Sequence, residues 1–266
     1  MAGPAGSAAS HYLSDLAAVV RYSALRLLAP ASAPRHAEAL RTLKRQSLLM
    51  LVIAAAAIIA LMFEVDLVEI QLMPPRGTPG LWPVRMLTDF GKDGYVLGAL
   101  AALLVVVVLL APWWRDRSRL CVRDLAMRLQ FMLLSVLLPL LAGEVVKWIA
   151  GRGRPFVGGE ANVFNFVPFA GTEAHAAFPS AHAITAFALA FAVGALWPRA
   201  KPAMIAYVIV IAASRLVLLA HHPSDVVAGA LIGVIGAMLV RYWFAARGLL
   251  FTIGDHGKIL PPAAPR

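Results

Sequence analysis

Three short polar clusters stand at the ends of apolar stretches in this sequence, and their side chains suit the chemistry of phosphate. In chain order, the clusters run from Lys147 to Pro155, from Pro179 to His182 and from Ser214 to Asp225. Seven of their side chains are candidates for this chemistry, namely three cations, a hydroxyl, two imidazoles and a carboxylate: Lys147, Arg154, Arg215, Ser180, His182, His221 and Asp225. Phosphate oxygens favour forked guanidinium contacts and charge neutralisation. The clusters therefore predict a phosphate site.

Two charged residues of these clusters also have a simpler interpretation when each is taken alone. Lys147 resembles an interfacial lysine that extends its amine to the membrane surface. Asp225 resembles an acidic residue that stabilises a helix N-terminus. Ionisable groups near a membrane span are costly, however, so several of them together favour a functional site.

The patterns KxxxxxxRP, PSxH and SRxxxxxHxxxD occur here in this order. They resemble the tripartite signature of the type 2 phosphatidic acid phosphatase superfamily, and the resemblance covers roughly residues 90 to 245. It implies phosphate transfer through a phosphohistidine, with no cofactor and no metal. In that mechanism His221 is the nucleophile, His182 the general acid and Asp225 the acceptor that fixes the His221 tautomer. The phosphate-binding groups that the resemblance implies are Lys147, Arg154, Ser180, Ala181 and Arg215.

The residue types also predict where these groups lie on their helices. Pro223 favours a first helical turn, which would contain Asp225 and leave His221 just outside. Ser180 is typical of an N-cap, whose helix would direct backbone N–H groups at an anion. Lys147 is expected in the last turn of a helix and Arg154 on the following loop.

Position 181 departs from the family pattern, because Ala181 stands where glycine is usual. Glycine would permit a positive φ or a close approach of the backbone to phosphate. Ala181 still offers its N–H if its φ is ordinary, so we expect activity to survive.

Four neighbouring residues are open to two interpretations each. His222 is expected to be a turn or cap residue rather than a second catalyst. His175 is either a solvated loop residue or a headgroup contact, and Arg152 is either a phosphate contact or an interfacial anchor. Glu144 lies one turn before Lys147, where it is either a partner in a helix-surface pair or a group that neutralises the lysine and partly weakens its binding of phosphate.

Composition indicates a membrane protein, because 61% of the 266 residues are hydrophobic and only 14% are charged. A spanning helix needs about 20 mainly apolar residues. The sequence predicts an all-α integral membrane bundle with six such stretches: 46–63, 94–111, 127–150, 181–197, 202–220 and 226–244. The predicted organisation is a leader (1–45), a six-span phosphatase domain (46–245) and a cytoplasmic tail (246–266). In the leader, Leu13, Leu16, Val20 and Leu27 recur at helical spacing, as in an interfacial amphipathic helix, although a disordered tail is the alternative.

The distribution of charge predicts the orientation of the bundle. Six spans place both termini on one side, and only seven of the 24 Lys and Arg residues fall on the other side: Arg76, Arg85, Lys92, Lys147, Arg152, Arg154 and Arg215. By the positive-inside rule the termini are cytoplasmic and the three clusters face outward. The net charge of +10 is thus explained by topology, and no nucleic-acid partner is expected.

These observations predict a multi-pass bacterial inner-membrane lipid phosphatase with a periplasmic site and a phosphorylated membrane lipid as its partner. Undecaprenyl diphosphate, phosphatidylglycerol phosphate, phosphatidate and lipid A phosphate all present the same reacting group. One alternative is metal-dependent hydrolysis, for which the candidate ligands are His182, His221, His222, Asp225 and Glu173. Another is a non-catalytic phospholipid-binding or transport protein that retains the phosphate pocket.

Overall fold

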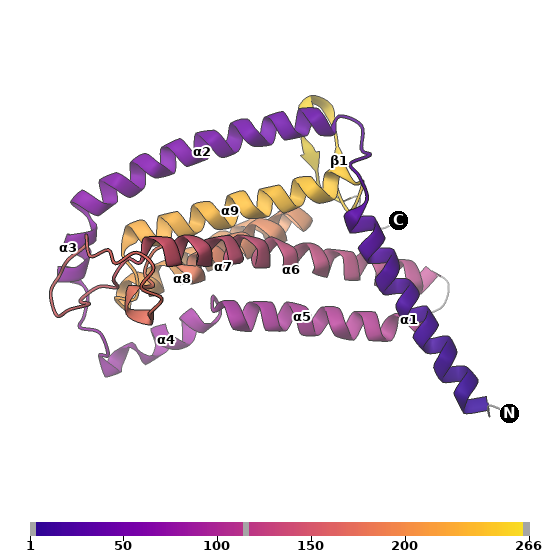
Figure 1. The fold of residues 1–266 in the computed structure, drawn as a ribbon, viewed down its shortest axis with the longest axis horizontal. Coiled ribbons are helices and arrows are strands. Elements are labelled where there is room, and N and C mark those ends of the chain that lie inside the picture. The colour runs from indigo at the N-terminus through magenta and orange to yellow at the C-terminus, as the bar shows by residue number, and fades with distance from the viewer. Residues whose placement is uncertain (1–3, 114–116, 263–266) are drawn as a thin grey trace.

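A computed structural model describes residues 4–113 and 117–262, so residues 1–3 of the predicted leader and 263–266 of the predicted tail lie outside it. Helices dominate the described residues, as predicted (Figure 1). The α-helices are α1 (Pro4–Leu28), α2 (His36–Glu64), α3 (Asp66–Leu72), α4 (Trp82–Asp89), α5 (Asp93–Leu110), α6 (Arg117–Ala150), α7 (Ala181–Leu196), α8 (Lys201–Val217) and α9 (Pro223–Ala246). Short 3₁₀ turns are η1 (Pro79–Leu81), η2 (Ala111–Trp113), η3 (Glu173–His175), η4 (Pro198–Ala200) and η5 (Asp255–Gly257), and the strands are β1 (Thr252–Ile253) and β2 (Ile259–Leu260).

Five stretches have the length and composition of membrane spans: His36–Glu64, Pro79–Trp113, Cys121–Ala150, Pro198–Val217 and Pro223–Ala246. The remaining predicted span, 181–197, is the apolar helix α7 of 16 residues. At 1.5 Å per residue it is about 24 Å long, which is shorter than a typical hydrocarbon core. The membrane bundle is therefore confirmed for five helices, and the total of six stays a prediction.

Helices α7 and α9 form the centre of the bundle, with α6 packed on both of them. Small residues make this contact close. A Cβ at Gly229 would lie 2.5 Å from the Ser180 carbonyl oxygen, and one at Gly233 would lie 2.5 Å from that of Ile184. Small residues in this pattern let membrane helices approach through their backbones. The close contact holds the N-terminal ends of α7 and α9 side by side.

The leader forms the helix α1, which crosses the end of the bundle that also holds the C-terminus (Figure 1). The Tyr12 hydroxyl donates to the Leu109 carbonyl at 2.8 Å, and Trp243 Nε1 donates to the Leu27 carbonyl at 3.1 Å. Because Leu13 is 62% exposed and Val20 is 53% exposed, part of the apolar side of α1 is left uncovered. The helical prediction for the leader is confirmed, and its position at a membrane surface stays a prediction.

Residues 252–260 of the predicted tail form a hairpin, in which β1 pairs antiparallel with β2 around η5. Two contacts attach the hairpin to the bundle. Arg241 Nη2 on α9 donates to the Ile259 carbonyl at 2.5 Å, and Gly257 packs on the backbone of α2 at Glu38 and Ala39. The hairpin therefore covers the gap between α2 and α9 at this end of the bundle.

Candidate active site

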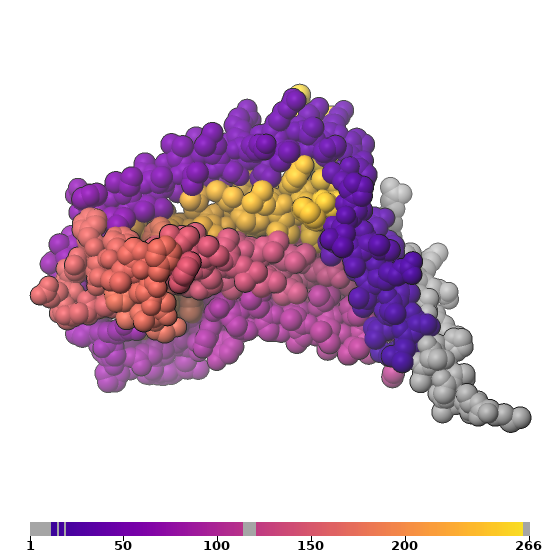
Figure 2. Space-filling model, viewed as in Figure 1, coloured from indigo at the N-terminus to yellow at the C-terminus, as the bar shows by residue number. Residues whose placement is uncertain are grey.

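All eight predicted site residues lie at one end of the bundle, opposite to the two termini. They come from the last turn of α6, the following loop, the first turn of α7, the last turn of α8 and the start of α9. Figure 2 shows the loop between α6 and α7 gathered over this end of the molecule. The His182 ring lies in the field of Arg215, Lys92, Arg154 and Lys147. Segments that are distant in the sequence therefore form one cationic region.

His221 is 3% exposed, and its ring is oriented by the backbone of the loop before α7. Its Nδ1 lies 2.7 Å from the Ala177 carbonyl oxygen, and a carbonyl can only accept a hydrogen bond. Nδ1 therefore carries the ring proton of the neutral imidazole, and Nε2 carries the free electron pair. Because a neutral imidazole attacks through its unprotonated nitrogen, Nε2 is the nucleophilic atom.

The family resemblance implies that Asp225 accepts a hydrogen bond from His221 and fixes its tautomer, and the structure differs from that expectation. Asp225 Oδ2 lies 4.0 Å from His221 Nδ1, which is beyond hydrogen-bonding distance. The same oxygen accepts from the His222 backbone N–H at 2.8 Å and so caps α9. At 4.0 Å the Asp225 carboxylate would stabilise a positively charged His221 ring through its charge alone.

Burial lowers the pKa of the His221 imidazole well below its usual range, and the positive charges of Arg215 and Arg154 lower it further. Protonation of the ring is unfavourable because the charged form loses its hydration and because it is repelled by the neighbouring cations. The free ring is therefore neutral at physiological pH, which is the state that a nucleophile requires.

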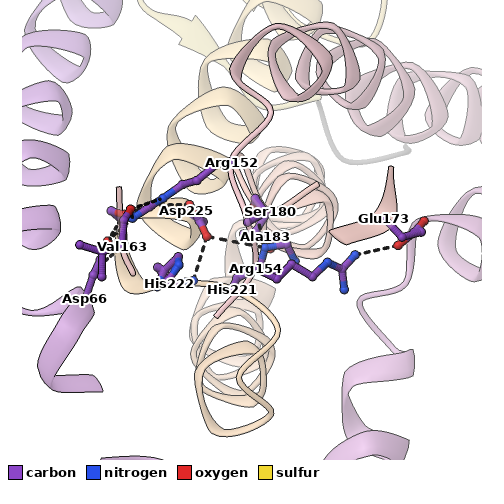
Figure 3. Close-up of polar contacts among 12 residues, drawn as sticks. Asp66, Arg152, Arg154, Val163, Glu173, Ser180, Ala183, His221, His222 and Asp225 are labelled. Carbon is purple, nitrogen blue, oxygen red and sulfur yellow. Dashed lines mark hydrogen bonds and ion pairs between the residues drawn. The ribbon is translucent and has the colours of Figure 1, made fainter. Parts of the chain in front are cut away.

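Arg152 is fully buried and joins four segments in one set of contacts, which we call the Arg152 network (Figure 3). Its Nη1 lies 2.7 Å from Asp225 Oδ1 and 2.6 Å from Ser224 Oγ. Its Nη2 lies 2.8 Å from Asp66 Oδ2 and 2.8 Å from the Val163 carbonyl. Neither of the two roles considered for Arg152 is found, since its guanidinium is occupied by the protein itself. The network fixes Asp225 and the first turn of α9.

Asp66 is the member of this network that sequence reasoning missed. It is fully buried, and it accepts from the Ser224 N–H at 3.1 Å and the Ser224 hydroxyl at 2.5 Å. Asp66, Glu69 and Ile70 are the buried residues of α3, at helical spacing. That spacing marks a buried face, but nothing in it identifies a partner 86 residues away.

Glu69 lies beside the network with neither carboxylate oxygen hydrogen-bonded among the described residues. Burial raises the pKa of Glu69 to about 8, with a further contribution from the negative charges of Asp66 and Asp225. Glu69 is therefore protonated at neutral pH. The Arg152 cation then pairs with the carboxylates of Asp66 and Asp225, which leaves the three groups with one net negative charge.

Each predicted phosphate-binding cation has a partner in the structure. Lys147 pairs with Glu144, and Arg154 Nη2 lies 2.9 Å from Glu173 Oε2 (Figure 3). The Glu173 side chain is 94% exposed, so this pair is weak and a phosphate could replace it. Arg215 Nη1 donates to the Thr88 hydroxyl on α4 at 2.7 Å.

Ser180 is the N-cap of α7, as predicted, and its hydroxyl accepts from the Ala183 N–H at 3.4 Å. Ala181 is the first residue of the helix, and its φ is not positive. Its conformation therefore does not require glycine. The first N–H groups of a helix have no partner within it, so those of Ala181 and His182 are open to an anion.

The remaining local predictions for α9 and its neighbours agree with the structure. Pro223 starts α9, His222 is its N-cap, and Asp225 lies in its first turn. His175 Nδ1 lies 3.2 Å from the Thr172 hydroxyl, within its own loop. Sequence reasoning missed Thr88, as well as Arg76 and Lys92, whose charges act on Arg215 and on His182 respectively.

The ligand set considered for a metal-dependent enzyme is not assembled among the residues that the structure describes. No three His, Cys, Asp or Glu side chains gather there as metal ligands. Asp225 and Glu173, which belonged to that set, pair with arginines.

Comparison with known proteins agrees with the motifs. Residues 128–249 match the PAP2 superfamily. A lipid A 1-phosphatase of Rhizobium johnstonii is 35% identical over 127 residues, which are 48% of this chain and 52% of that protein. A lipid A 1-phosphatase of Rhizobium etli is also 35% identical over 127 residues, 48% of this chain and 55% of that protein. The chain thus spans about half the length of the curated relatives it matches, and no solved structure matches it.

Proposed function

We propose that this chain is a membrane phosphatase that hydrolyses a lipid phosphate through a phosphorylated His221, since residues 128–249 match the PAP2 superfamily. One observation carries the proposal. The hydrogen bond from His221 Nδ1 to the Ala177 carbonyl leaves Nε2 as the unprotonated nitrogen of the ring. The positive charges of Arg154 and Arg215 lie close enough to affect this ring.

The reaction has two steps. In the first, His221 Nε2 bonds to phosphorus while the bond from phosphorus to the lipid oxygen breaks. His182, protonated when the negative charge of the bound phosphate offsets the surrounding cations, gives its proton to that oxygen. In the second, His182 takes a proton from water, the water oxygen bonds to phosphorus, and the bond to His221 breaks. Asp225, 4.0 Å from the ring, stabilises the charged phosphohistidine between the steps. The cationic side chains and the N-terminus of α7 hold the phosphoryl oxygens.

For the substrate we place lipid A 1-phosphate first, because both relatives described above are lipid A 1-phosphatases. Undecaprenyl diphosphate, phosphatidylglycerol phosphate and phosphatidate present the same group and form the comparison panel. We further propose a bacterial inner-membrane location with the site on the periplasmic face, on the basis of the positive-inside rule.

Phosphate release from these four lipids tests the proposal. We expect hydrolysis by the unaltered chain to be unaffected by a chelator and to be abolished in His221→Ala. His182→Ala should lower kcat by about 10²–10⁴, the usual contribution of a general acid. His175→Ala is the matched control, since it removes a nearby histidine with only a local contact, and it should retain activity.

Two outcomes would contradict the mechanism. A fully active His221→Ala variant would exclude the phosphohistidine, and loss of activity in chelator would support the metal-dependent alternative. If the unaltered chain binds a lipid phosphate without turnover, the alternative of a non-catalytic phospholipid-binding or transport protein is supported.

A further inference from the structure

A large cavity lies at the end of the bundle opposite to the active site. Its volume is about 960 Å³, and it is bounded by α2, α7, α8, α9 and the C-terminal hairpin. Small-molecule sites usually have about 300–1,000 Å³, so this cavity could hold much of a large ligand. Its walls include Ala39 at the start of α2 and Lys201 at the start of α8, so it opens near the membrane surface.

The cavity changes from basic to apolar with depth. Lys201, Arg241 and Lys258 line it near the surface. Val208 on α8 and Val234 on α9 each lie seven residues further into the bundle than the basic residue of the same helix, which is about 10 Å along a helix axis. A ligand that fits this gradient has an anionic end at the surface and an apolar part inside.

The charge of the cavity lining has one sign. No Asp or Glu is among the described residues that line it, and Lys201 and Lys258 form no ion pair within the described part of the chain. The stem of Lys201 crosses α7 at Gly194, where a Cβ would lie 3.1 Å from its Cγ. These cations are therefore uncompensated beside an apolar opening.

Helix α2 leaves the side of the cavity accessible from the bilayer. Its first turns pack at Ala39 and Leu43, but none of its most apolar stretch is buried. Helix α2 packs on α9 but not extensively on α8, and both α2 and α8 line the cavity, so acyl chains can enter between α2 and α8.

We propose that this cavity binds an anionic glycerophospholipid from the leaflet at the end that holds both termini. Its acyl chains lie against the apolar walls from α7, α8 and α9, and its headgroup phosphate pairs with Lys201 and Lys258. A soluble phosphate would not use the apolar depth, and a zwitterionic lipid would not need the uncompensated cations. This site lies at the opposite end from the proposed catalytic site, and its test does not depend on phosphatase activity.

Native mass spectrometry of the delipidated full chain, titrated with phosphatidylglycerol or phosphatidylcholine, tests the proposal. We expect one phosphatidylglycerol to bind more tightly than phosphatidylcholine. Lys201→Gln/Lys258→Gln should weaken phosphatidylglycerol binding by about thirtyfold, since each lysine near an anionic lipid contributes about 1 kcal/mol. Ala190→Trp, which fills the apolar wall, should weaken the binding of both lipids.

Lys44→Gln/Arg45→Gln is the matched control. It removes two exposed charges from the same end of α2, outside the cavity lining, and should leave binding unchanged. Equal affinity of the unaltered chain for the two lipids would overturn the proposal, as would equal losses in the two double variants. Competition by glycerol phosphate as strong as by the lipid would indicate a soluble anion, and a dimer disrupted by Ala190→Trp would indicate a second copy of the chain; either result would overturn it.

Discussion

His221 illustrates how a backbone group can prepare a side chain for catalysis. The Ala177 carbonyl fixes the proton on Nδ1, burial keeps the ring neutral, and Asp225 lies close enough to act by charge without a hydrogen bond. The orientation and the electrostatic stabilisation of the nucleophile are therefore supplied by different groups. Their effects can be separated by experiment.

The pKa of His221 leads to a prediction for the pH profile. Because its folded-state pKa lies below 6.5, the neutral nucleophile persists as the pH falls, and the acidic limb of kcat/KM should lie below pH 6.5. Arg215→Gln removes the largest charge effect on this pKa and should move the limb to higher pH. Arg215→Lys keeps the charge and should leave it in place, although both variants lower the rate. A limb unmoved by Arg215→Gln would show that the substrate titrates instead.

Ala181 gives a second prediction, about the departure from the family pattern. Its φ is ordinary, so Ala181→Gly should change kcat/KM by less than about twofold. Gly is less favourable than Ala in a helix by about 1 kcal/mol at most. Steady-state kinetics with the preferred lipid measure the effect. A rise of tenfold or more would show that the backbone at this position needs the freedom of glycine.

Helices α3 and α9 are joined to the loop after α6 by the Arg152 network, and this connection holds the catalytic segments in register. Arg152 and Asp66 are fully buried and paired. A buried pair adds little net stability when it is complete, but breaking it leaves a charge without compensation. The network is therefore best tested by removing one partner.

Asp66→Asn should lower the free energy of unfolding by about 3 kcal/mol, the lower end of the range for a broken buried pair, because Asp225 still balances Arg152. It should also lower kcat, since Ser224 and Asp225 lose part of their support. Glu64→Gln removes an exposed charge two residues earlier and should change stability by less than about 0.5 kcal/mol. Denaturation in mixed micelles measures both variants, and equal values would contradict the role of Asp66.

The helices of the bundle could be predicted because apolar runs mark the parts that lie in lipid. The helix ends were predicted less accurately. Helix α2 begins ten residues before the predicted start at position 46, and its first turns were missed because they carry polar residues. In the site, residues whose type fixes their local position, such as Ser180 and Pro223, were placed correctly. The role of Ala177 was missed because every residue has a backbone carbonyl, so the residue type carries no signal. Asp66 was missed because its partner Arg152 is distant in the sequence.

The molecule as a whole is polarised, with the candidate active site at one end and both termini, α1 and the cationic cavity at the other. Cys121 lies near the start of α6, where Arg123 contacts the Tyr22 ring of α1, and it is exposed. It therefore marks the end that holds the termini. The charge distribution predicts that this end is cytoplasmic.

Labelling with a membrane-impermeant maleimide tests this orientation. In intact spheroplasts we expect no labelling of Cys121, but labelling of Ala161→Cys in a Cys121→Ser background, since Ala161 is exposed on the loop over the site. Inside-out vesicles should reverse the pattern. Labelling of Cys121 in intact spheroplasts would place the active site on the cytoplasmic face.

The Arg152 network also limits whether residues 128–249, which hold the predicted catalytic groups, can be transferred to another protein. Residues 128–249 hold every predicted catalytic group, yet Asp66 and Thr88, which contact Arg152 and Arg215, lie before that stretch. A chimera that grafts this stretch onto a foreign N-terminal half would leave Arg152 without Asp66 and Arg215 without Thr88. Exchange between relatives should succeed only when the donor's α3 and α4 travel with it.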